Sequence, residues 1–197
     1  MIIDEKILRL YGGEDVEVNA REILFSENTT PEFYYQVKVG IIKLINIYSK
    51  TEFIHTYISE GECLGENFLI TQTPYTLRAV ANEKSIVTRL PRFQFMEILA
   101  KYSTCNTALL QLMAKRMCYK DEMMFAISSN NPKVKIMTLL KQLKESQSQG
   151  IRVSYEIPLT RKEISNMLGI RVETVIRCIK SLENNGMVSI VNGKIQL

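Results

Sequence analysis

Short apolar runs separated by turn residues dominate the first half of the chain. Runs of β-branched and aromatic residues predict strands over residues 33–39, 41–48, 53–58 and 85–90. Glycines and polar residues between the runs predict turns at Gly40, residues 49–51, Gly61 and Gly65. Because these strands follow one another closely with no helix expected between them, the pattern favours an antiparallel sandwich or roll.

After Pro91 the spacing of apolar residues becomes helical, over residues 92–102 and then 104–127. In the longer helix, apolar side chains recur at near-heptad spacing, at Leu109, Met113, Met117 and Met124. Such a stripe needs a partner surface. It either packs on the β-domain or forms the seam of a dimer.

A polar segment ending in Asn131 and Pro132 interrupts the helical pattern. Asn131 is a suitable cap and Pro132 a suitable first residue for the next helix, which is expected to reach about residue 145. A loop over 147–150 and an alternating strand over 151–157 follow. The chain is therefore expected to consist of a β-domain (1–103), a linking helix (104–130) and a small C-terminal domain (131–197).

Charge is distributed unevenly between these parts. Residues 1–130 hold 14 Lys and Arg against 16 Asp and Glu, a net charge of −2, whereas residues 131–197 hold 11 against 5, a net charge of +6. A basic small domain suggests a polyanionic partner, although a solvated lysine-rich surface is an alternative on charge alone.

The segment 159–182 has the pattern of two short helices joined by a tight turn. Thr160 and Glu163 form a predicted capping box that starts the first helix, and Gly169 permits the turn. The inward-facing apolar residues are expected to be Ile164, Met167 and Leu168 in the first helix, and Val175, Ile179 and Leu182 in the second, over 172–183. Two such helices form a helix-turn-helix reader of DNA.

The outer face of the second helix carries groups that can read base edges in a major groove. Arg177 suits guanine O6 and N7, Glu173 suits cytosine N4, and Val172 suits a thymine methyl. Phosphate contacts are expected from Thr160, Arg161, Thr174 and Lys180. Alternatively, Glu173 and Arg177 simply pair with each other on an exposed helix face, for about 0.3 kcal/mol.

A hairpin signal follows the second helix. Residues 187–191 and 194–197 flank Asn192 and Gly193, a pair typical of a type I′ turn. The order helix, strand, helix, turn, helix, hairpin is that of a winged helix domain.

At this point the chain resembles the cyclic-AMP receptor protein and fumarate-nitrate regulator (CRP/FNR) family. The likeness rests on residues 160–164 and 173–180, and upstream on the glycine turns within 37–43 and 58–66. It implies an α+β protein with an N-terminal double-stranded β-helix (a jelly-roll-like β-roll), a long dimerisation helix and a C-terminal winged helix-turn-helix. It also implies a homodimer whose reading helices lie about 34 Å apart on a palindromic promoter site, with Glu173 and Arg177 as base readers.

The resemblance also places a degenerate effector pocket in the roll. Relatives that bind cyclic nucleotides follow a Gly-Glu pair with an Arg-Ser or Arg-Thr pair that holds the phosphate. Here Gly65 and Glu66 are present, but Tyr75 and Thr76 stand at the second pair and offer no positive charge. Lys120 and Asp121 stand where the purine would be contacted. Cyclic AMP is therefore not expected as a cofactor, and the effector is unidentified.

Arg171 is a further departure, because relatives often place a capping hydroxyl residue at this helix start and Arg cannot accept the N–H bonds. We expect Arg171 to reach a phosphate instead.

Other chemistries have little support in the sequence. The four cysteines are dispersed and His55 is the single histidine, so no metal site is expected, and the absence of a nucleophile with a base argues against an enzyme. No run of 18 apolar residues is present, so we expect a cytoplasmic protein that does not enter a membrane. The sequence thus predicts a DNA-binding transcription regulator that acts on RNA polymerase. The alternative is a small-molecule-binding module whose winged domain mediates protein contacts.

Overall fold

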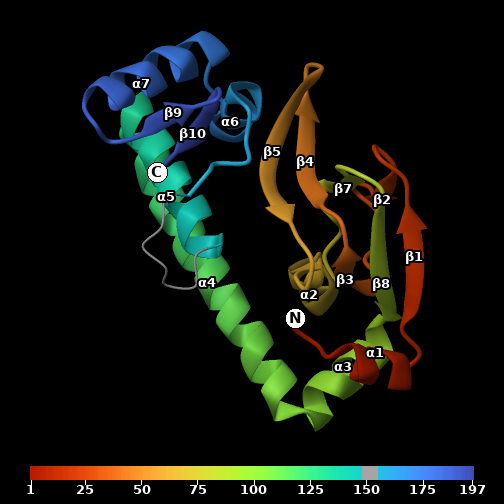
Figure 1. Cartoon of the computed structure of the whole chain (residues 1–197). Coiled ribbons are helices and arrows are strands. Elements are labelled where there is room, and N and C mark those ends of the chain that lie inside the picture. Colours follow the sequence, from red (N-terminus) through yellow and green to blue (C-terminus); the bar gives the residue numbers. More distant parts are fainter. Residues whose placement is uncertain (148–154) are drawn as a thin grey trace. The chain divides into compact units, whose positions relative to one another are not determined.

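The computed structural model of the chain describes residues 1–147 and 155–197. These residues form two compact units, Met1–Met113 and Ala114–Leu197, and the boundary between them falls within one long helix (Figure 1). Of the helices in the described residues, none has both the length and the hydropathy that a membrane span requires.

The first unit is built around two four-stranded antiparallel sheets, ordered β1-β8-β3-β6 and β2-β7-β4-β5. Their strands are β1 (Glu14–Val18), β2 (Ile23–Phe25), β3 (Phe33–Val39), β4 (Ile42–Tyr48), β5 (Thr51–Ile58), β6 (Cys63–Leu64), β7 (Arg78–Ala81) and β8 (Ser85–Pro91). The expected roll is therefore confirmed. All four predicted strands are present with ends shifted by two residues or fewer, and the turn residues Gly40, Gly61 and Gly65 have positive φ.

The expectation that no helix interrupts the strands is wrong. A helix of 6 residues, α2 (Glu66–Thr71), follows β6, and another, α1 (Glu5–Leu10), precedes β1. Each is too short to produce a recognisable helical period in the sequence. Residues Gly65 and Gln72 flank α2 in the left-handed region, at φ 75° and 56°, and so confine it to less than two turns.

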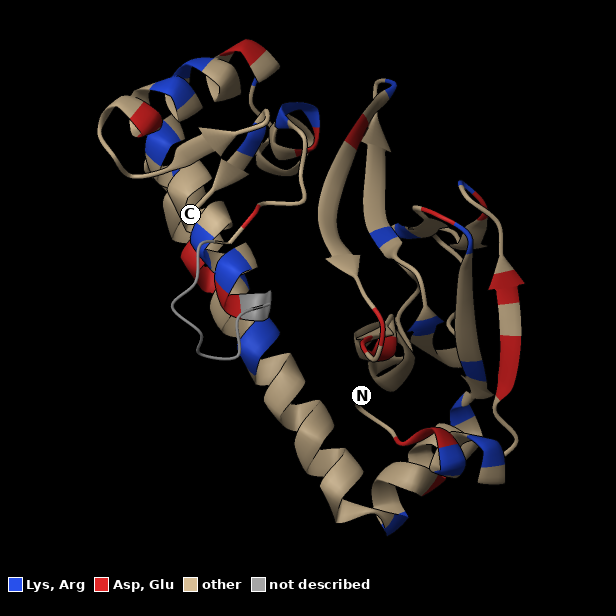
Figure 2. Cartoon of the chain, viewed as in Figure 1, with Lys and Arg blue, Asp and Glu red and all other residues tan. Residues whose placement is uncertain are grey.

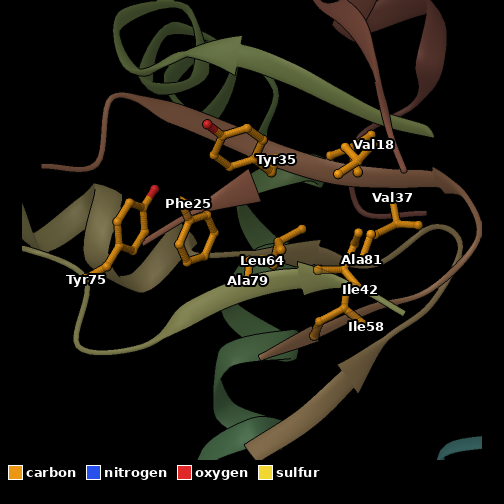
Figure 3. Packing of buried hydrophobic residues seen from close by; sticks show 11 residues of the cluster. Val18, Phe25, Tyr35, Val37, Ile42, Ile58, Leu64, Tyr75, Ala79 and Ala81 are labelled. Carbon is orange, nitrogen blue, oxygen red and sulfur yellow. The ribbon is translucent and has the colours of Figure 1, made fainter. Parts of the chain in front are cut away.

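The core of the roll lies between the two sheets (Figure 3). On β3, Tyr35 and Val37 belong to this core, whereas Tyr34 packs on the other side in a second cluster with residues of α1 and of α3 (Arg92–Lys101). This alternation is what the two-residue period of a strand requires. The buried amide of Gln36 is satisfied because its Oε1 accepts from Ile3 N at 3.0 Å and from the Tyr34 hydroxyl at 2.7 Å.

Helix α4 (Ser103–Ser128) continues from α3, and its first turns pack in the second cluster. Leu109 is only 3% exposed there, and Met113 is partly buried against the same cluster. The apolar stripe predicted for this helix therefore divides into residues that pack within the protomer and residues that do not.

The second unit contains α5 (Pro132–Gln147), α6 (Arg161–Leu168), α7 (Val172–Asn184), β9 (Ser189–Val191) and β10 (Lys194–Gln196). Asn131 caps α5 as predicted, because its Oδ1 accepts from Lys133 N at 3.0 Å. Most of the predicted loop 147–150 and strand 151–157 lies outside the described residues. Its last part is described, and there Ile157 N donates to Ile195 O at 2.8 Å, which joins this segment to β10.

Candidate DNA interface

Helix α6 begins with the capping box that the sequence predicts. Glu163 N donates to Thr160 Oγ1 at 3.2 Å, and Thr160 N donates to Glu163 Oε2 at 2.7 Å. Two N–H groups at the helix start are thus satisfied reciprocally. The start of α6 is thereby fixed by residues three positions apart.

The turn between the two helices is also locally determined. Gly169 has φ 62°, in the left-handed region that favours glycine, and ends α6. Ser165 Oγ donates to Ile170 O at 2.7 Å, which ties the turn back onto α6. These contacts hold the second helix, α7, at a defined angle to the first.

Helix α7 separates a buried face from a polar one. Val175, Ile179 and Leu182 are at most 2% exposed, as predicted. Glu173, Arg177 and Lys180 lie on the opposite face and are exposed. Along α7, Figure 2 shows both Lys and Arg in blue and Glu in red. An exposed polar helix face that carries hydrogen-bond donors and acceptors suits a major groove.

Within the described residues, Glu173 and Arg177 form no ion pair with each other or with another side chain. The alternative interpretation, in which the two residues merely pair on the helix surface, has no support in this geometry. Both side chains remain available to a partner outside the chain.

The wing is a two-residue hairpin. Val191 pairs with Lys194, and the loop residues Asn192 and Gly193 have φ 49° and 78°, the double positive φ of a type I′ turn. The Arg161 guanidinium donates to Gly193 O, which joins the start of α6 to the tip of the wing. The sequence predicted only a phosphate contact for Arg161. Its contact with the wing joins elements far apart in the chain and could not be predicted from local spacing.

The other residues predicted to contact phosphate differ in how free they are. Lys180 and Arg171 are exposed, and Arg171 precedes α7 without making a side-chain cap. Val172 and Thr174 are half-buried, and the Thr160 hydroxyl is engaged with Glu163. Their contacts with DNA stay predictions.

Aromatic side chains pack beside Gly65, where the resemblance implies an effector pocket. Tyr75 is 2% exposed and stacks on Phe25 (Figure 3). It also meets Phe68 edge to face, at 5.5 Å between ring centroids. Gly65 lies against this stack, since a Cβ on it would stand 3.1 Å from Tyr75 Cε1. Burial raises the pKa of the Tyr75 phenol above its ordinary value.

The remaining pocket residues are divided between buried and exposed positions. Glu66 is 2% exposed, whereas Thr76 is exposed on the surface. Arg78, the nearest basic residue in sequence, is directed to Glu27, with 3.3 Å between Nη2 and Oε2. Lys120 and Asp121 are exposed residues of α4.

On α4, the residues proposed for the dimer seam also divide into two groups. Leu109 is 3% exposed within the first unit, so its side chain is poorly placed to meet another protomer, whereas Met113 is only partly buried there. Met117 and Met124 are 66% and 68% exposed, and Leu110, which the sequence analysis passed over, is 68% exposed. Leu109 is therefore wrong as a seam residue, the seam role of Met113, Met117 and Met124 stays a prediction, and Leu110 is an added candidate.

His55 lies in strand β5 as expected, with Nε2 2.6 Å from Asn46 Oδ1. The four cysteines are free thiols, and two of them, Cys63 and Cys105, are buried. Among the described residues, no cluster of three His, Cys, Asp or Glu is placed to hold a metal ion.

Comparison with known proteins agrees with this architecture. Residues 15–102 match the model of the cyclic nucleotide-binding domain, and residues 134–197 match that of the Crp-like helix-turn-helix domain. The chain is 27% identical over 181 residues to the anaerobic regulatory protein of Haemophilus influenzae, covering 90% of this chain and 69% of that protein.

Two of the solved structures that match the chain illustrate its fold. A CooA mutant from Carboxydothermus hydrogenoformans superimposes with a TM-score of 0.82 at 17% identity, covering 99% of this chain and 87% of the other. A transcriptional regulator of the CRP/FNR family from Thermus thermophilus does so with a TM-score of 0.69 at 20% identity, covering 93% of each chain.

The Crp-like helix-turn-helix match, together with the exposed polar face of α7 and the wing, identifies a DNA-binding transcription regulator of the winged helix-turn-helix class. The relatives that it resembles are regulators and not enzymes. Both domain matches and the similarity to the regulators point to one family. The chain belongs to the CRP/FNR family.

Proposed function

We propose that the protein binds palindromic promoter sites as a homodimer, with one α7 helix in the major groove of each half-site. The observation that carries this proposal is the exposure of Glu173 and Arg177 on the face of α7 opposite the buried Val175 and Ile179. A two-fold dimer places its two reading helices about 34 Å apart, one turn of B-DNA.

Base recognition is assigned to Val172, Glu173 and Arg177. Arg177 donates two hydrogen bonds to a guanine, Glu173 accepts from a cytosine amine, and Val172 contacts a thymine methyl. Contacts with the phosphates of the DNA backbone are assigned to the exposed cations Arg171 and Lys180. Thr160 and Arg161 at the start of α6 and Thr174 at the start of α7 assist them. Affinity then falls steeply with salt, whereas sequence preference does not.

Dimerisation is assigned to α4 through Leu110, Met117 and Met124. These side chains recur at every seventh position and are all about two-thirds exposed. A seven-residue apolar repeat is the pattern by which two helices supercoil around each other. The bound dimer acts on transcription by contacting or obstructing RNA polymerase, in the cytoplasm.

No cofactor is assigned to the roll. The stacked rings of Phe25 and Tyr75 occupy its interior beside Gly65, and Arg78 is directed to Glu27 instead of inward. A cyclic nucleotide would need both space and a cation for its phosphate. We therefore expect cyclic AMP to change neither the melting temperature nor the affinity for DNA, as differential scanning fluorimetry and a binding titration would show.

The proposal is tested by selecting bound sequences from a random DNA pool at several salt concentrations. We expect an inverted repeat with its half-sites one helical turn apart. Recovery of unrelated sequences, with no repeat at any salt concentration, would overturn the assignment of α7 as a reader. The winged domain would then be better explained as a surface for protein contacts.

A further inference from the structure

Two charged residues interrupt the exposed apolar face of α4. Between Met117 and Met124 the helix carries Lys120 and Asp121, both exposed. Asp121 lies four residues after Met117 and three before Met124, so at 3.6 residues per turn it falls on the same face, and Lys120 flanks it. Charges at such positions are unfavourable in a dimer seam unless they meet a complement.

Neighbouring charges on α4 have partners inside the protomer. Lys115 Nζ lies 5.5 Å from the centroid of the Tyr119 ring, and Glu122 Oε2 accepts from Gln142 Nε2 at 3.3 Å. Lys120 and Asp121, by contrast, form no ion pair within the described residues. Among the residues that the structure describes, these two α4 charges therefore have no ion-pair partner, and both border the apolar face.

A second copy of the chain supplies the complement. The heptad can be assigned in two ways along this face. If Met117 and Met124 are at d positions, Asp121 is at a and Lys120 at the preceding g. If the two methionines are at a positions, Lys120 is at d and Asp121 at e. In a parallel two-stranded coil, an a side chain lies beside the preceding g of the other helix, and a d side chain beside the e. Both assignments bring Lys120 of one protomer beside Asp121 of the other, and the two-fold axis repeats the contact.

We propose that Lys120 and Asp121 form two reciprocal ion pairs across the α4 seam, which select the parallel, in-register dimer. The inference rests on the proposed homodimer and assigns what determines its alignment. The apolar repeat alone tolerates a shift of one heptad, because Met117 then meets Leu110 or Met124. The same shift places the charges opposite apolar or small neutral residues and breaks both pairs.

The experiment measures dimer dissociation constants of the full chain by sedimentation equilibrium. Lys120→Asp and Asp121→Lys each put four like charges at the seam and are expected to weaken the dimer at least about tenfold, since like charges brought together across an interface are strongly unfavourable. The double variant Lys120→Asp/Asp121→Lys restores both pairs with their signs exchanged. Its constant is expected to return to within about threefold of the wild type.

Two further samples make the test specific. An equimolar mixture of the two single variants is expected to form a heterodimer that is tighter than either homodimer, because both cross-seam pairs then join an aspartate of one chain to a lysine of the other. Lys115→Asp changes the net charge by the same amount away from the seam, and it is expected to leave the constant within about twofold of the wild type.

The outcomes separate this proposal from the homodimer itself. A dimeric wild type whose single charge reversals leave the dissociation constant unchanged would refute the ion pairs and keep the dimer. A wild type that stays monomeric, with Met117→Lys sedimenting identically, would refute the homodimer and the pairs together. Because both charges are exposed, circular dichroism of each variant is expected to match the wild type.

Discussion

Tyr75 and Phe25 stack face to face in the roll, with ring centroids 3.9 Å apart and ring planes 10° from parallel. The rings of both residues pack directly against Gly65. The Tyr75 hydroxyl is buried there and, among the described residues, accepts and donates no hydrogen bond. A buried polar group of this kind lowers stability.

Replacing Tyr75 with Phe is therefore expected to keep the stack and raise the free energy of unfolding by about 1 kcal/mol. Urea denaturation followed by far-ultraviolet circular dichroism measures the change. Tyr75→Ala, which removes the ring, is the matched control and is expected to cost about 3–5 kcal/mol. A clear loss of stability in Tyr75→Phe would mean that the hydroxyl has a partner.

Arg177 is expected to determine one base pair in each half-site. Arg177→Ala should lose about 1–3 kcal/mol of discrimination at that pair and little elsewhere, because a bidentate contact to guanine is removed. Competition binding on single-base operator variants measures the discrimination. Lys180→Ala is the control: it should weaken all sequences alike and lower the salt slope by about one. Equal discrimination by the Arg177→Ala and wild-type proteins would remove Arg177 from the readers.

Arg171 begins α7 without capping it. Arg171→Ser supplies an oxygen that can accept from an N–H of the first turn, so the second unit is expected to gain about 0.5–1 kcal/mol of stability. The same change removes a cation, so DNA binding should weaken and its salt dependence should decrease. Thermal unfolding and a salt titration of binding test the two effects separately. Unchanged DNA affinity would argue against a phosphate contact from Arg171.

Asp15 links β1 to its neighbours in the first unit. Burial alone would raise the pKa of its carboxyl, but hydrogen bonds from Thr88 and Lys38, together with Arg9, outweigh burial and hold it below the ordinary value of 3.8. Thr88 Oγ1 and Lys38 Nζ lie 2.8 and 3.1 Å from the carboxylate oxygens. The charged form is therefore favoured by folding.

A lowered folded-state pKa adds stability above the unfolded-state value, and that stability is lost as the pH falls through the folded-state value. Asp15→Asn is thus expected to reduce stability at pH 7, by no more than about 1 kcal/mol because the carboxylate is partly exposed. The difference from the wild type should shrink below about pH 4. Urea denaturation across this pH range measures it. A difference that grows toward low pH would contradict the assignment.

The helix-turn-helix could be predicted from the sequence to within one residue. Its capping box joins Thr160 to Glu163, its turn depends on Gly169, and α7 buries residues three and four apart. Each of these signals acts between near neighbours, so a local pattern contains it. The strand over residues 33–39 and the hairpin around Asn192 were predictable for the same reason.

Which face of α4 is free, by contrast, depends on tertiary packing. Leu109 and Leu110 are adjacent apolar residues, and a helical repeat passes through either one. Packing in the second cluster buries the first and leaves the second 68% exposed. The contact of Arg161 with Gly193 and the stack of Tyr75 on Phe25 likewise join residues far apart in the chain. Such contacts depend on how whole elements come together, and no short-range period in the sequence records that arrangement.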